Sequence, residues 1–138
     1  MSQIEWKEQY TLGDEGFDED IKKIVERMNK ILHAYEQPES QKDVLEELRF
    51  LGDELAISFS RQEYRMKEYL YPPYFSHKRE HDSFLEKYKK YREEAGKEGE
   101  LVAAVMKIRG IIEEWLENHV IVEDKKLVAF LKKKEQGM

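Results

Sequence analysis

Five polar residues occupy positions that otherwise belong to the apolar faces of predicted helices: Ser58, Gln62, His77, His81 and His119. His77 and His81 are four residues apart, so both imidazoles project from the same side of one helix, as chelation of one metal ion requires. His119 faces inward from the next predicted helix. In a helical core these groups must be hydrogen-bonded or bind a ligand, because an unsatisfied buried polar group costs about 1 to 3 kcal/mol.

Asp124 could complete a shell of three imidazoles and one carboxylate, which is chemically sufficient to bind iron or zinc. It follows His119 by five residues, so on an ideal α-helix it lies about 140° further round the axis. We therefore expect it to reach the same ion only if the axis bends or the carboxylate leans back. The alternative is a set of hydrogen-bonded core histidines, since two histidines at this spacing are a weak signal alone. His33, the fourth histidine, is predicted to lie at the surface.

Four segments with helical periodicity must position these residues. Apolar residues recur every three or four positions over residues 18–37, 41–69, 74–95 and 99–133. Residues 1–16 lack this period and are predicted to form an N-terminal arm, with Asp18 as the N-cap of the helix that follows. The sequence predicts an all-α fold, an antiparallel up-down-up-down four-helix bundle in a single domain over residues 1–138.

The composition argues against several other classes of protein. The 138 residues contain no cysteine, which removes disulfide scaffolds, thiolate metal sites and cysteine nucleophiles. The formal net charge of -6 disfavours nucleic acid as a partner, because phosphates demand a basic surface. No apolar run has the length of a membrane span and no secretory signal is recognisable, so we expect a cytoplasmic protein with no membrane partner.

The candidate ligands lie within motifs that resemble the hemerythrin family, especially its bacterial single-domain form. The motifs cover nearly the whole chain and are Ile4-x-Trp6, Tyr10-x-Leu12-Gly13, Phe17-Asp18, Phe59-x-x-x-Glu63-x-x-Met66, Tyr71-Pro72, His77-x-x-x-His81-x-x-Phe84 and Trp115-Leu116-x-x-His119-x-x-x-x-Asp124-Lys125-Lys126-Leu127. The resemblance implies a four-helix bundle that holds two non-haem irons bridged by two carboxylates, one iron with three histidines and the other with two. It implies that His77, His81 and His119 match the three-histidine iron and that Asp124 matches one bridging carboxylate.

Three of the family's ligand positions are changed in this chain. Ile21 stands where the family has a histidine on the first helix, and Ser58 and Gln62 stand where it has a histidine and a glutamate on the second. The losses fall on the second iron and on the other bridge, so one metal position keeps all its histidines. Ser58 and Gln62 could hydrogen-bond each other, a water or the remaining aspartate. Asp20 and Glu63 are poor replacements, because each lies about 100° off the inward face.

The sequence therefore predicts a hemerythrin-like protein that holds one metal ion, iron in preference to zinc, in a half-site of three histidines and one aspartate. In the family, dioxygen binds at the iron with two histidines, so reversible dioxygen carriage of that type is expected to be lost here. The two coordination positions freed by the missing bridges could take dioxygen, nitric oxide or a small anion, which would suit a sensing or binding role.

Two other interpretations stay open. The first is a metal-free bundle that serves as a structural or interaction module, as the changes at Ile21, Ser58 and Gln62 would allow. The second is a diiron oxygen-binding protein that uses replacement ligands. A conventional enzyme is disfavoured, because Ser58 has no histidine on its own segment to activate it. The sequence does not identify a protein partner.

Overall fold

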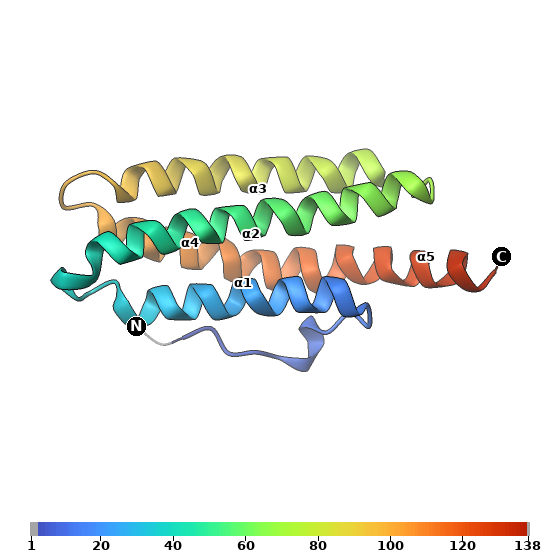
Figure 1. The fold of residues 1–138 in the computed structure, drawn as a ribbon. Helices are drawn as coiled ribbons and strands as arrows, with labels where there is room; N and C mark the ends of the chain where they lie inside the picture. Colours follow the sequence, from blue (N-terminus) through green and yellow to red (C-terminus); the bar gives the residue numbers. More distant parts are fainter. Residues whose placement is uncertain (1–2, 138) are drawn as a thin grey trace.

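The computed structural model describes residues 3–137, and all regular structure in this range is helical (Figure 1). Residues 1, 2 and 138 of the predicted domain lie outside the described part. The elements are η1 (Glu8–Tyr10), α1 (Glu15–Ala34), η2 (Pro38–Ser40), α2 (Gln41–Glu68), α3 (Tyr74–Ala95), α4 (Leu101–Glu114), η3 (Trp115–Asp124) and α5 (Lys125–Gln136). The all-α fold class predicted from the sequence is confirmed.

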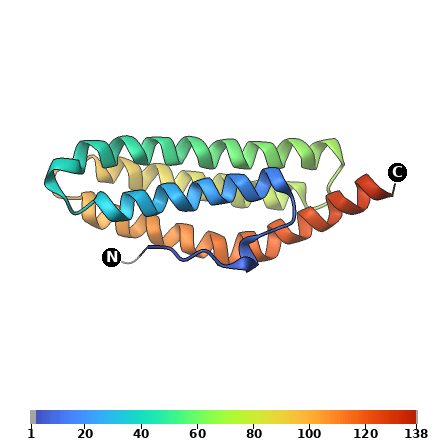
Figure 2. The same cartoon turned by 60° about the horizontal axis from the view of Figure 1, so that its bottom comes forward.

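The helices lie side by side along one long axis (Figures 1 and 2). α4, η3 and α5 follow one another without a break and form the fourth long segment, which extends beyond the others at the C-terminal end (Figure 1). Connections between successive segments lie at alternate ends of the molecule, as an up-down-up-down order requires (Figure 1). None of the helices in residues 3–137 combines the length and the apolar character that crossing a bilayer requires.

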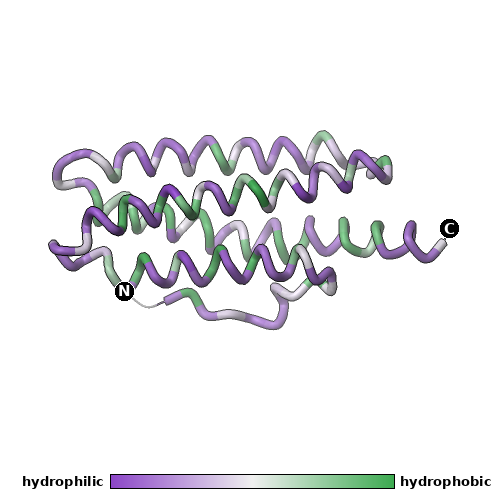
Figure 3. The backbone as a smooth tube through the Cα atoms, viewed as in Figure 1, coloured by the Kyte–Doolittle hydropathy of each residue, from purple (hydrophilic) through white to green (hydrophobic). Residues whose placement is uncertain are grey.

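The core runs along the axis between the four segments. Hydrophobic and hydrophilic residues alternate along each helix with a helical period (Figure 3). Apolar side chains with almost no exposed surface come from all four segments and include Ile21, Ile24, Leu48, Leu51, Leu55, Tyr88, Ile108, Ile112, Leu116 and Leu127. Each such burial contributes about 1.5 to 3 kcal/mol before conformational entropy is subtracted. The polar residues that interrupt these apolar faces are therefore carried into the interior with them.

Helix α1 begins at Glu15 because Asp14 is its N-cap, so the prediction of Asp18 as the cap was wrong. The Asp14 carboxylate accepts a hydrogen bond from the backbone N–H of Phe17 at 3.1 Å. Asp18 accepts hydrogen bonds from the N–H groups of Leu12 at 2.6 Å and Gly13 at 3.0 Å. Asp18 thus attaches the N-terminal arm to the start of α1. The arm lies beside α1 and the fourth segment (Figure 2).

We expect Asp14→Ala to lower the free energy of unfolding by about 1 to 2 kcal/mol, because it removes the cap and a 2.5 Å ion pair with Arg65. Burial alone would raise the pKa of Asp14, but Arg65 and the N–H of Phe17 hold it below its ordinary value. A carboxyl with a depressed folded pKa stabilises above its unfolded pKa of about 3.9 and loses that contribution as the pH falls further. Urea unfolding at pH 7 and near pH 2.5 should show the difference between wild type and variant shrink at the lower pH. An equal difference at both would contradict the assignment.

The turn after α2 contains a strained leucine. Leu70 has a φ of +53°, and the N–H of Tyr71 donates to the carbonyl of Met66 at 2.8 Å, the hydrogen bond of a Schellman helix ending. Glycine is the usual residue at this left-handed position, because a side chain there costs about 1 to 2 kcal/mol. Leu70 is 84% exposed, so packing does little to compensate the strain.

Leu70→Gly is therefore expected to raise the free energy of unfolding by about 0.5 to 1 kcal/mol, the relief of strain being partly offset by the greater flexibility of glycine in the unfolded chain. Leu70→Ala keeps the strain and serves as the control, with little expected change. Urea denaturation of the two variants beside wild type measures both effects. A glycine variant less stable than the alanine variant would show that the strain at φ +53° costs less than the flexibility that glycine adds to the unfolded chain.

Candidate metal centre

The three inward histidines converge on one point inside the bundle. The Nε2 atom of His119 lies 3.2 Å from Nε2 of His77 and 3.2 Å from Nε2 of His81. Oδ1 of Asp124 lies 2.9 Å from His119 Nε2 and 3.3 Å from His77 Nε2. One donor atom from each of the four residues lies within 4.8 Å of every other, and all four side chains are buried. The structure thus brings together the four residues that the sequence singled out as metal ligands.

A change of helix type explains how Asp124 reaches the histidines. His119 and Asp124 both belong to η3, a π-helical run of 10 residues. In a π-helix the backbone hydrogen bonds span five residues, so side chains five apart lie on nearly the same side, whereas an α-helix would separate them by about 140°. The expected bend or backward lean of the carboxylate is therefore not the explanation, since the helix widens instead. π-Helical geometry is rare, and it occurs frequently at functional sites.

Two carboxylates hold the histidine rings from their outer side. His81 Nδ1 lies 2.8 Å from Oε2 of Glu63, and His119 Nδ1 lies 3.0 Å from Oε1 of Glu80. When Nδ1 donates its proton outward, the lone pair of Nε2 points inward, which is the tautomer that metal binding requires. The Phe59 ring stacks on the His81 ring at 4.1 Å between centroids and fixes its plane. The rings are thus oriented before any ion binds.

Sequence reasoning assigned a role to neither of these carboxylates. The sequence places Glu63 off the inward face, and the structure places it behind His81, outside the group of converging donor atoms. Glu80 also lies off the inward face of its helix, so the helical period gives it no role. Its position three residues after His77 and one before His81 was the only signal, and that spacing is common on exposed helix surfaces.

The charge state of the group fits a cation. Burial alone would raise the pKa of Asp124, but the adjacent imidazoles of His119 and His77 outweigh this effect and lower the pKa to about 2. The carboxylate is therefore ionised at neutral pH. Within residues 3–137, no donor is aligned to hydrogen-bond either carboxylate oxygen, and His77 Nδ1 is likewise unpartnered. A buried, ionised carboxylate without an aligned hydrogen-bond donor is costly. A metal ion among these donors would remove that cost, and the donor set suits iron or zinc.

The three changed family positions are all buried in the same interior. Oε1 of Gln62 lies 3.0 Å from His77 Nε2, so its side-chain partner is a histidine, which the sequence does not suggest. Ile21 offers no donor atom, and Asp20 pairs with Arg61 at 2.9 Å instead of turning inward. Elsewhere in the described residues, no second group of three or more His, Asp or Glu side chains is close enough together to hold an ion.

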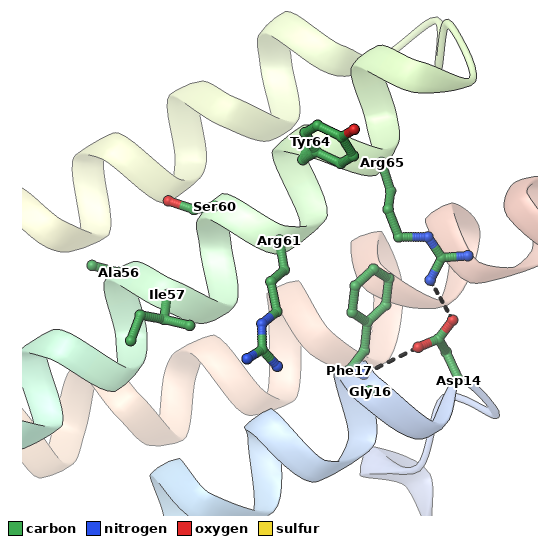
Figure 4. A pocket seen from close by; sticks show the side chains of 9 residues that line it. All are labelled: Asp14, Gly16, Phe17, Ala56, Ile57, Ser60, Arg61, Tyr64 and Arg65. Atoms are coloured by element: carbon green, nitrogen blue, oxygen red, sulfur yellow. Dashed lines mark hydrogen bonds and ion pairs between the residues drawn. The ribbon is translucent and has the colours of Figure 1, made fainter.

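Among the surface pockets of the described residues, one touches the inward histidines. A pocket of about 380 Å³ lies over the outer sides of His81 and His119, with Glu80 and Trp115 in its wall. A larger one of about 790 Å³ lies between the start of α1 and the middle of α2 (Figure 4). None of the four converging residues lines this larger pocket, and the Arg65 guanidinium at its edge is paired with Asp14 (Figure 4). The candidate site is therefore the buried group of histidines.

A helical bundle with inward histidines and a carboxylate defines the class of non-haem metal-binding bundles. The sequence matches the Hemerythrin HHE cation binding domain over residues 12–131, so the chain belongs to the hemerythrin family. It is also similar to the bacteriohemerythrins of Pseudomonas paraeruginosa and Pseudomonas aeruginosa. Each is 28% identical over 130 residues, which covers 90% of this chain and 78% of the relative. The family resemblance predicted from the motifs is confirmed.

Proposed function

We propose that the protein binds one metal ion, iron in the first instance, through Nε2 of His77, His81 and His119 and the carboxylate of Asp124. The observation that carries this proposal is the convergence of four buried donor groups, one of which is an ionised carboxylate with no aligned hydrogen-bond donor. The outward contacts of Glu63 and Glu80 support it, because carboxylates behind ligating histidines are typical of metal sites. Zinc fits the same donors and is the second candidate ion.

The number of ions in the proposal is one. Ile21 and Ser58 replace the imidazoles that a second ion would need, and Asp20 and Glu63 are engaged elsewhere. We therefore propose that reversible dioxygen carriage of the family type is lost. The alternating connections in Figure 1 support an antiparallel up-down-up-down order. Ligands from α3 and η3 lie close together, with His119 Nε2 3.2 Å from the Nε2 atoms of His77 and His81.

We propose that the role of the site is to bind or sense a small molecule. Four protein donors leave room in a six-coordinate shell for dioxygen, nitric oxide or a small anion. When bound, the ion would supply a Lewis-acid or redox centre for such a ligand. The pocket over His81 and His119 brings solvent to the outer side of the site, where the half-exposed Glu80 holds His119. The cytoplasmic location stays a prediction from the sequence.

Metal analysis of the whole protein tests the proposal. Protein purified without chelator is incubated anaerobically with Fe²⁺, or separately with Zn²⁺, and freed of unbound metal. The proposal predicts one ion per chain that survives gel filtration, together with an iron spectrum that lacks oxo-bridge absorption. Protein that retains no ion would overturn it.

A metal-free structural module is the second candidate function. It is favoured by the 3.0 Å contact between Gln62 Oε1 and His77 Nε2, which gives one of the imidazoles a hydrogen-bond partner without any ion. Under this alternative the same metal analysis returns no stoichiometric ion, and excess Zn²⁺ leaves the melting temperature unchanged. Under the one-ion proposal, bound metal raises the melting temperature, because an ion that binds only the folded state stabilises it.

A further inference from the structure

We propose that the amide oxygen of Gln62 is a fifth ligand of the same ion, an inference that rests on the proposed function. Gln62 Oε1 lies 3.0 Å from His77 Nε2, within the 2.9 to 3.3 Å range that separates neighbouring donors among His77, His119 and Asp124. Donors at about 2.0 to 2.2 Å from one ion and at right angles to each other are roughly 3 Å apart. The position of Gln62 is therefore that of a neighbouring ligand.

When His77 binds a metal ion through Nε2, it can no longer donate a hydrogen bond to Gln62. A ligating His77 has no proton on Nε2, so the 3.0 Å contact would place two acceptors face to face. Gln62 is buried on α2 and cannot turn its amide to bulk water. Two buried acceptors at this separation repel unless a cation lies between them or the amide turns over to present its NH2 group, which would occupy the lone pair that a metal needs. One ion that receives both lone pairs resolves the conflict, and no rearrangement of α2 or α3 is needed.

A neutral oxygen at this position also bears on the number of ions. Asp124 is the only carboxylate among the converging donors, so the ligating atoms themselves supply one negative charge against the two positive charges of a divalent ion. A second cation about 4 Å away would meet a repulsion of several kcal/mol even at an effective dielectric constant near 20. Gln62 thus adds a fifth ligand to one ion without supplying the negative charge that would attract another.

Replacing Gln62 changes the metal affinity in opposite directions depending on whether Gln62 is a ligand or an obstacle to metal binding. If Gln62 is a ligand, Gln62→Leu weakens metal binding. If Gln62 only holds His77 in the wrong tautomer, Gln62→Leu removes an obstacle and tightens binding. The probe is Zn²⁺, which has no redox chemistry, titrated against a chromophoric chelator. The matched control is Gln41→Leu, the same substitution at an exposed position of α2.

We expect Gln62→Leu to weaken Zn²⁺ binding by about tenfold or more, the size of effect that loss of a supporting polar group has at metal sites. Gln62→Asn keeps the buried amide but withdraws its oxygen by one methylene, so it should weaken binding too and replaces the leucine variant if that one misfolds. Gln41→Leu should match wild type. Equal or tighter Zn²⁺ binding by both Gln62 variants would overturn the role of Gln62 as a ligand and leave the proposed function intact. Wild-type protein that binds no Zn²⁺ would overturn both.

Discussion

His119→Ala should abolish stoichiometric metal binding. Its Nε2 lies within 3.2 Å of the donors of His77, His81 and Asp124, so its loss removes the group that all the other ligands surround. We expect an affinity loss larger than the roughly 10- to 100-fold that removing an outer partner of a metal ligand causes. The measurement is metal content after anaerobic loading with Fe²⁺.

The same variant should also lose stability as the metal-free protein. His119 is the imidazole closest to the buried Asp124, whose carboxylate would then have weaker electrostatic compensation. His33→Ala is the matched control, because His33 is exposed on α1 and makes no part of the converging group. It should keep one ion per chain. A His119→Ala protein that still retains one ion would show that His119 is not one of its ligands.

The triple variant Ile21→His, Ser58→His and Gln62→Glu should bind two irons per chain. It restores, at buried positions, the two imidazoles and the carboxylate that the family resemblance assigns to the second iron and the other bridge. Iron content and the appearance of oxo-bridge absorption on exposure to air measure the outcome. The same protein with alanine instead of histidine at position 21 lacks one ligand and should bind the second ion more weakly.

Without metal, the triple variant should be less stable than wild type. Ser58 is almost fully buried, and a larger side chain in a packed interior costs about 1 to 3 kcal/mol. Iron loading should recover this loss, because the ions bind only the folded chain. One iron per triple-variant chain would mean that residues beyond these three decide the number of ions.

The sequence predicted the parts of the site that follow α-helical periodicity. His77 and His81 are one turn apart on α3, and His119 continues an apolar face, so their inward direction could be derived from spacing alone. Asp124 could not be placed in this way, because its approach depends on the π-helical winding of η3, and an α-helical period assigns it to another side.

Groups outside the inward faces were not accessible to the same reasoning. Glu80 acts from behind His119, where its spacing looks like that of any exposed carboxylate. Asp14 and Asp18 are both good N-cap residues, and the arm decides between them, since its N–H groups engage Asp18. Gln62 lies on the predicted face, but its partner depends on the side-chain conformation of His77 on another helix. Such choices are made by tertiary packing rather than by local pattern.

Anomalous diffraction from crystals of iron-loaded protein tests the central claim most directly. Data collected on either side of the iron absorption edge locate each bound ion independently of any variant. The account predicts one anomalous peak per chain, within about 2.0 to 2.2 Å of the Nε2 atoms of His77, His81 and His119 and of a carboxylate oxygen of Asp124. Two peaks in the core, or none among these four residues, would contradict it.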